Sequence, residues 1–354
     1  MKLGDPIAPL SLYGFRRILS KFRFRNRCGV AISGGVDSLL LAYLVSQLKI
    51  SSQAPFFGAA LIVDHHARPD STREAQHVQK LVTNWGLKSV ILDLPQIPSR
   101  RTSSTFEKDA RELRYSVLAE ACLQYKLPDL LVAHHADDQM ETFFMRLMMG
   151  SRAWGLAGME PIAPIPGYPS TESNDLRLLR PFLGLRKSHL IATAKFNNIK
   201  WLEDPTNGDP SYTSRNAIRK FLSNESALPE ALRPSRIIPL LESLSRNRHR
   251  TRAQVANLIQ KSQRNVNLYM GTVDIIFPAK FKMATDQALV RYLTGIANMI
   301  TPYEKIKISA MDTAVDTIFR RTWASPNQFT AGGLLWTLHN EADNEADNEA
   351  DNEA

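Results

Sequence analysis

The sequence predicts an α/β fold, in which a doubly wound, mainly parallel sheet is followed by a smaller, mainly helical second domain. Three observations lead to this prediction. The first two hundred residues alternate short apolar runs with longer helical patterns, as βαβ units do. A length of 354 residues suits two or three domains. Beyond about Phe221 the pattern becomes helical and polar.

The predicted elements alternate along the chain from the first strand onward. Ligands of open parallel sheets bind beyond the carboxyl ends of the strands, so the residues that follow each strand are the first candidates for a site. Strands are expected at residues 28–33, 57–64, 89–93 and 130–133, and helices at residues 38–48, 71–85 and 107–125.

Residues 1–27 form a basic N-terminal segment with two interpretations. Asp5 is the only acid before Asp37. Organellar transit peptides are basic, amphipathic and poor in acids, so the segment could be one. It could equally be a helix that packs beside the first strand, with an apolar face made of Tyr13, Phe15, Ile18, Leu19 and Phe22.

Residues 221–340 are expected to form a basic, mainly helical region that binds RNA. The formal charge of the chain is +9 although its last residues, 341–354, are acidic, and such a surplus favours a polyanionic partner. An arginine-rich run at residues 246–252 is either a solvated helical face or a phosphate-contacting surface. The tail 341–354 repeats Glu-Ala-Asp-Asn and is expected to be disordered.

Composition disfavours several classes of protein. No apolar stretch is long enough to span a membrane, so we expect no membrane partner and a soluble intracellular protein, either mitochondrial or cytoplasmic. Cys28 and Cys122 lie far apart and form no Cys-x-x-Cys pair, which disfavours a disulfide framework and a structural zinc site. The oligomeric state is open, with a homodimer as one option.

A glycine-rich loop follows the first predicted strand. It comprises Ser33, Gly34, Gly35, Val36, Asp37 and Ser38. Two glycines let the backbone approach a ligand closely, and free amides at a helix start can hold phosphate oxygens. A carboxylate beside phosphates needs a cation between them, so Asp37 is a candidate Mg²⁺ ligand. The alternative is an ordinary turn with a helix cap.

The string Ser-Gly-Gly-x-Asp-Ser resembles the pyrophosphate (PP) loop of N-type ATP pyrophosphatases. This resemblance implies an adenine nucleotide α-hydrolase-like fold and the use of ATP with Mg²⁺. It also implies cleavage of ATP between the α and β phosphates, adenylation of a carbonyl oxygen, and displacement of AMP by a nucleophile. The loop is not a Walker A motif, because the Gly-Lys-Ser/Thr of that motif is absent.

A second cluster follows the fourth predicted strand. His134 leaves the strand, and Asp137, Asp138 and Glu141 fall on the first turns of a helix. Carboxylates at the start of a helix complement the helix dipole, so a purely structural role would explain their presence. The same groups could bind magnesium or an ammonium group.

Five ordered motifs resemble those of tRNA(Ile)-lysidine synthetases and cover roughly residues 28–220. The first two are the loop and the second cluster. The others are Asp64, His65, His66, Arg68 and Pro69, then Gly150, Ser151 and residues 155–159, and finally residues 203–207 with Asp209, Tyr212, Arg215, Asn216, Ile218 and Arg219.

This second resemblance implies that the C2 oxygen of the wobble cytidine of tRNA(Ile) with a CAU anticodon is adenylated and that the ε-amine of free lysine then attacks C2. Residues 221–340 would bind the tRNA. The loop residues 33–38 would bind ATP. Asp37, Arg114 and Asp138 would be catalytic, and substrate contacts would come from His134, Asp137, Glu141, Asp204, Asn207, Arg215 and Arg219.

Each of these assignments has a structural alternative. Arg114 could form an exposed helical ion pair, and Asp138 could be a helix cap. Asp204, Asn207, Arg215 and Arg219 could stabilise a hydrogen-bonded turn. At the level of function, the rivals are a PP-loop tRNA thiolase, which usually needs paired catalytic cysteines, and a non-catalytic RNA-binding relative.

Overall fold

The computed structural model of this chain describes residues 8–25, 27–50, 57–66, 70–95, 103–168, 175–202, 213–267, 269–277, 284–301, 306–320 and 327–339. The chain divides into two compact units, Met1–Leu244 and Ser245–Ala354. Asp204, Asn207 and the acidic repeat tail lie outside the described residues. No described helix is long and apolar enough to cross a membrane.

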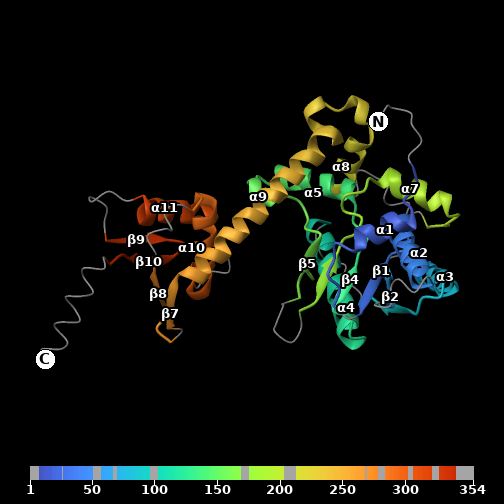
Figure 1. Ribbon diagram of the computed structural model, residues 1–354, viewed down its shortest axis with the longest axis horizontal. Helices are drawn as coiled ribbons and strands as arrows, with labels where there is room; N and C mark the ends of the chain where they lie inside the picture. The colour runs from blue at the N-terminus through green and yellow to red at the C-terminus, as the bar shows by residue number, and fades with distance from the viewer. Residues whose placement is uncertain are drawn as a thin grey trace, which may run out of the picture. The chain divides into compact units, whose positions relative to one another are not determined.

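The first unit is built on a six-stranded sheet in the order β3-β2-β1-β4-β6-β5 (Figure 1). The first five strands in this order run parallel, and β5 pairs antiparallel with β6 at the edge. The predicted mainly parallel sheet is confirmed. The strands are β1 (Cys28–Ile32), β2 (Phe57–Asp64), β3 (Ser89–Asp93), β4 (Asp129–Leu131), β5 (Ile162–Pro164) and β6 (Arg177–Leu179).

Helices cover both faces of the sheet, as a doubly wound fold requires. One face packs against α1 (Leu12–Leu19), α2 (Val36–Ile50), α3 (Ser71–Asn84) and α7 (Lys187–Phe196), whose apolar residues share one core cluster. The other face packs against α4 (Ser103–Gln124) through Leu118, Ala119 and Cys122. The first βα turn thereby places the glycine-rich loop at the carboxyl edge of the sheet.

Two short strands of the first unit, β5 and β6, were not expected from the sequence. β5 lies in a Pro- and Gly-rich segment that reads as a surface loop, and β6 follows that segment. Each strand has three residues, too few to show a recognisable alternation. Pro164 is tolerated because β5 is an edge strand.

The basic N-terminal segment contributes a helix to the core. Ser11 caps α1 by accepting a hydrogen bond from the Gly14 amide. Phe15 is fully buried and packs against Phe182, with ring centroids 5.9 Å apart. The helix interpretation of this segment therefore agrees with the structure.

The first unit continues beyond residue 220, where the sequence pattern suggests its end. After α8 (Ser214–Ser223), the 3-10 turns Glu225–Ala227 and Glu230–Leu232 lead into α9 (Pro234–Lys261). Leu228, Ile237 and Leu241 share an apolar cluster with residues of α5 (Ala136–Met148). This packing ties residues 221–244 to the first unit.

The second unit combines helices with two hairpins. Its core is formed by α10 (Asp286–Ile300), α11 (Ile308–Phe319) and the later part of α9. The hairpins are β7 (Gln263–Asn267) with β8 (Thr272–Ile276), and β9 (Gln328–Ala331) with β10 (Leu334–Thr337). Gly332 and Gly333 have positive φ angles in the second turn, a conformation that glycine adopts without strain.

Candidate active site

A cavity of about 430 Å³ opens in the first unit at the carboxyl ends of β1, β2 and β4. Its walls come from the glycine-rich loop, α4, the start of α5, and α8. Nine of the residues expected from the sequence line it: Ser33, Gly35, Asp37, Ser38, Arg114, His134, Asp138, Arg215 and Arg219. Groups from distant parts of the chain therefore meet at one place.

Hydrogen bonds of its own serines fix the conformation of the glycine-rich loop. Ser38 Oγ accepts a hydrogen bond from the Ser33 amide at 3.1 Å and donates one to the Gly35 carbonyl at 3.1 Å. Gly34 has a φ of +82°, and a Cβ atom there would lie 3.2 Å from the side chain of Val78. Neither Gly34 nor Val36 lines the cavity, and Val36 packs in the core. These two residues shape the loop from behind.

Asp37 lies in the first turn of α2, and in the described part of the chain only one of its two carboxylate oxygens contacts positively charged or hydrogen-bonding side chains. Its Oδ2 lies 3.4 Å from Lys187 Nζ and 3.6 Å from His135 Nε2. Its Oδ1 is buried and has no hydrogen-bond partner among the described residues. A buried, unsatisfied carboxylate oxygen is costly, and hard cations such as Mg²⁺ prefer oxygen ligands of this kind. The residues present therefore fit a magnesium ion at Asp37.

Asp138 is both a helix cap and a cavity residue. The Asp138 amide donates to His135 Nδ1 at 3.3 Å, and Asp138 Oδ2 accepts from the His135 amide at 2.9 Å, which forms a reciprocal capping box. Its other oxygen, Oδ1, accepts a hydrogen bond from Arg215 Nη2 at 3.0 Å. The cap fixes the carboxylate at the cavity wall.

Glu141 holds two arginines in place from behind the cavity. It is 2% exposed and does not line the cavity. Its Oε2 accepts from Arg215 Nε at 2.6 Å, and its Oε1 accepts from Arg219 Nε at 2.8 Å. Glu141 thereby fixes two cavity arginines, and its expected direct contact with substrate stays a prediction.

Asp137 likewise forms hydrogen bonds within the protein, with residues at the start of α7. Its Oδ1 accepts from Arg186 Nε at 3.0 Å, and its Oδ2 accepts from the Lys187 amide at 2.7 Å. Asp137 does not line the cavity. It joins the start of α5 to the start of α7, and so places Lys187 beside Asp37.

The two neighbouring histidines have opposite electrostatic environments. Burial, together with the charges of Arg180, Arg111 and Arg215, lowers the pKa of His134 to about 3 against the pull of Asp138. Burial also opposes protonation of His135. There, however, a hydrogen bond to Asp37 and the charges of the nearby aspartates outweigh burial and raise the pKa. His134 is therefore neutral near pH 7.

Asp138 stays ionised at the same pH. Burial favours its neutral form, but the charges of His135 and Arg215 and a backbone hydrogen bond from His135 outweigh burial and lower the pKa. The cavity thus presents a fixed carboxylate next to a neutral imidazole.

The structure adds residues that sequence reasoning did not assign to the site. Arg180 is 5% exposed and donates from Nε to His134 Nδ1 at 3.3 Å. It directly follows β6, so recognising that strand would have revealed it. Further additions to the cavity wall are His65, Arg111, Tyr115, Thr213 and Asn216.

The chain is 32% identical over 83% of its length to a probable tRNA(Ile)-lysidine synthase from Schizosaccharomyces pombe. It is 33% identical over 69% of its length to a tRNA(Ile)-lysidine synthase from Anaplasma marginale. The chain spans 64% and 48% of the lengths of these relatives, less than two thirds of each.

A structural comparison finds a U34-tRNA thiolase from Methanococcus maripaludis, with a TM-score of 0.48 and 17% identity over 68% of this chain and 78% of the thiolase. The model of the PP-loop domain matches residues 12–226, more than half of the chain. The chain therefore belongs to the PP-loop domain family.

Proposed function

We propose that this chain is a tRNA(Ile)-lysidine synthetase. The observation that carries the proposal is the single cavity that gathers the glycine-rich loop with Arg114, His134 and Asp138. The relatives named tRNA(Ile)-lysidine synthase support the choice of reaction. The substrates are ATP, free lysine and tRNA(Ile) with a CAU anticodon.

The loop is the ATP-binding part of the proposal. Its backbone amides and serine hydroxyls at the start of α2 suit phosphate oxygens. A magnesium ion held by Asp37 would neutralise phosphate charge. The C2 oxygen of the wobble cytidine attacks the α phosphorus, the bond between the α and β phosphates breaks, and pyrophosphate leaves with the bonding electron pair.

The carboxylate of Asp138 is the lysine-binding part of the proposal. Its ionised state suits an ammonium group, because Arg215 and the capping box keep it charged and fixed. Orienting the amine near C2 is the main contribution expected of such a residue. The ammonium group first loses a proton to water, and the neutral amine then attacks C2. The carbon-nitrogen bond forms as the bond between C2 and its oxygen breaks, and AMP leaves with that oxygen and the bonding electron pair.

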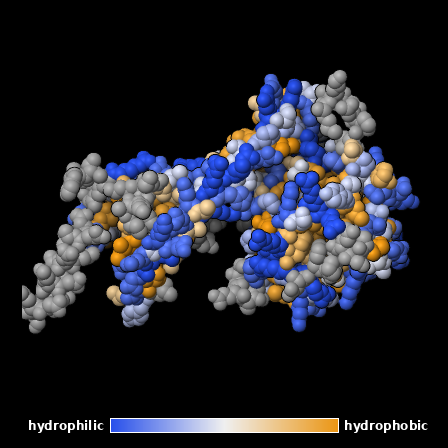
Figure 2. Space-filling view, viewed as in Figure 1, coloured by the Kyte–Doolittle hydropathy of each residue, from blue (hydrophilic) through white to orange (hydrophobic). Residues whose placement is uncertain are grey.

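The exposed arginines at the start of the second unit are the proposed tRNA contacts. Arg246, Arg250 and Arg252 are exposed on α9. Figure 2 shows hydrophilic side chains along this helix. Such groups contribute affinity for the phosphate backbone rather than sequence discrimination.

A thiolase is the rival enzyme, and its sulfur chemistry finds little support. Cys28 and Cys122 are both buried and neither lines the cavity. Burial raises the pKa of Cys122 to about 12 and raises the pKa of Cys28 as well, so both thiols stay protonated. These two cysteines serve the core.

The test is incorporation of radiolabelled lysine into unmodified tRNA(Ile) with a CAU anticodon, with and without ATP. tRNA(Met), which carries the same anticodon, is the control. We expect ATP-dependent labelling of the isoleucine tRNA alone. Absence of labelling, with AMP released instead when a sulfur donor is supplied, would favour the thiolase.

A further inference from the structure

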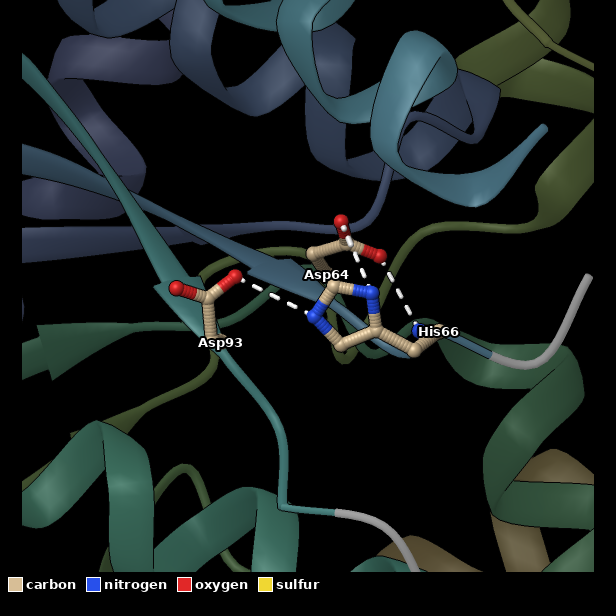
Figure 3. A group of neighbouring side chains, drawn as sticks. All are labelled: Asp64, His66 and Asp93. Carbon is tan, nitrogen blue, oxygen red and sulfur yellow. Dashed lines mark hydrogen bonds and ion pairs between the residues drawn. The ribbon is translucent and has the colours of Figure 1, made fainter. Parts of the chain in front are cut away.

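Outside the cavity wall, three side chains converge beyond β2 and β3 (Figure 3). Asp64 ends β2 and Asp93 ends β3, and the parallel register pairs these two residues directly. His66 lies two residues beyond Asp64 and places its ring between the two carboxylates. The fold therefore brings two acids and an imidazole to one point at the sheet edge.

The cluster has one oxygen that its own hydrogen bonds do not satisfy. The His66 amide donates to Asp64 Oδ1 at 3.0 Å, and His66 Nε2 lies 3.1 Å from Asp93 Oδ1. Asp64 Oδ2 lies 3.5 Å from His66 Nδ1, beyond the usual length of a hydrogen bond. This Oδ2 is buried and has no hydrogen-bond partner among the described residues.

The burial of Asp64 Oδ2 indicates that this oxygen needs a partner. Asp64 is 1% exposed, and a buried carboxylate oxygen without a partner costs free energy unless a cation or donor reaches it. Among the three side chains of the cluster, the oxygen faces the His66 ring, whose Nδ1 lies 3.5 Å away (Figure 3). A cation placed there would contact a buried oxygen and two groups that solvent can reach.

We infer that Asp64, His66 and Asp93 form a binding site for a divalent transition-metal ion, and that this site prefers Zn²⁺. The three residues offer one ligand atom each, all within 4.8 Å of one another. Metal–ligand bonds of about 2.0 to 2.2 Å would require the three side chains to close in on the ion, with the His66 ring turning from its place between the two carboxylates. An imidazole nitrogen with two carboxylates suits zinc better than magnesium or calcium, which favour oxygen alone.

The site is distinct from the magnesium position at Asp37 and does not depend on the proposed function. Its place suggests a positioning role. His65, which lies between Asp64 and His66, lines the cavity. A metal that ties the ends of β2 and β3 together would hold that part of the cavity wall and stabilise the fold.

The test measures zinc bound to the full-length protein after chelator treatment and dialysis against Zn²⁺, by elemental analysis and by calorimetric titration. We expect one zinc ion per chain, and a Tm that rises with zinc. His66→Asn and Asp93→Asn should each weaken zinc binding at least about tenfold. Asn is chosen at position 66 because the φ of His66 is +45°, a region that Asn tolerates.

Two controls define the position. Asp70→Asn removes an exposed acid near the cluster, and Asp37→Asn removes the magnesium ligand; both should bind zinc as the wild-type protein does. The inference is overturned if the wild-type protein binds no zinc, since the histidine alone would then bridge the two acids. It is also overturned if His66→Asn and Asp93→Asn bind zinc normally, or if Asp37→Asn loses it.

Discussion

The two units of the chain use their charges in opposite ways. In the first unit, Asp138, Glu141 and Arg180 are buried around the cavity. Asp138 and Glu141 both accept hydrogen bonds from Arg215, and Arg180 donates one to the Glu160 carbonyl. In the second unit the core cluster is apolar, built from residues such as Leu289, Tyr292 and Leu293. Most arginines of its arginine-rich run on α9 are exposed, namely Arg246, Arg250 and Arg252, and Arg248 is the one arginine of that run that is buried.

This difference is consistent with the separate roles proposed above for the two units, catalysis in the first and tRNA binding in the second. Burying charges costs free energy even when they are paired, so a buried network is retained where its geometry serves a reaction. Exposed charges cost little and suit a polyanion whose binding depends on salt. Variants of the first unit should change turnover by orders of magnitude, and variants of the second should change affinity by small factors.

The largest effect is expected from Asp37→Asn. In the proposed mechanism Asp37 holds a magnesium ion beside the phosphates, and the amide would lack the charge to do so. ATP-dependent AMP formation should therefore fall on the order of 10³-fold. Single-turnover assays with labelled ATP measure this. Glu120→Gln, an exposed change on α4, is the matched control. Turnover within a few-fold of the wild type would remove Asp37 from the mechanism.

Asp138→Asn should abolish lysine incorporation and leave the fold intact. The amide can still cap α5, although removing the charge that faces Arg215 in this largely buried pair should cost roughly 3 kcal/mol of unfolding free energy. Labelled-lysine transfer and urea unfolding separate the two effects. Full transfer activity in a folded variant would contradict the role assigned to this carboxylate.

The paired histidines should give opposite pH dependences of stability. The pKa of His134 is lower in the folded state than in the unfolded chain, so its contribution is present above about pH 6.5 and is lost as pH falls toward 3. The pKa of His135 is raised, so its contribution is complete below about pH 6.5 and is lost as pH rises through the folded-state pKa.

Urea unfolding from pH 3 to 9 measures both contributions. His134→Gln should flatten the acid limb by up to about 1.4 kcal/mol per pH unit, and His135→Gln should flatten the alkaline limb. If the variants and the wild type have parallel profiles, the histidine environments described above are wrong.

The smallest effect is expected from Arg250→Ala in the second unit. Removing one phosphate contact should weaken RNA binding only a few-fold, and equally for different tRNAs. The slope of the logarithm of the binding constant against the logarithm of the salt concentration should become shallower by about one. Filter binding at several salt concentrations tests this, with Lys195→Ala in α7 as a control. Unchanged affinity and slope would identify this arginine as a solvated surface residue.

Parts of the fold follow directly from the sequence, and other parts do not. The bounds of β2 and β3 match the expected ranges, because their apolar runs are long enough to detect. The short β6 escaped detection, and with it Arg180. A three-residue strand is recognisable only from the neighbour that it pairs with.

The site shows the same limit. Ser33, Asp37 and Asp138 could be selected from local motifs, because each lies at or within a few residues of the end of a predicted strand. The partners of Glu141 could not, because Arg215 is 74 residues away in sequence. Local patterns indicate which residues are chemically able to act, whereas packing decides which face the cavity and which hold others in place.

The most direct test of the account follows ATP labelled in its α phosphate through a reaction with tRNA(Ile), lysine and the full-length protein. The account predicts labelled AMP, formed only when the tRNA is present, together with a wobble nucleoside heavier by one condensed lysine in mass spectrometry. Labelled ADP, or AMP formed without any change in the nucleoside mass, would contradict it.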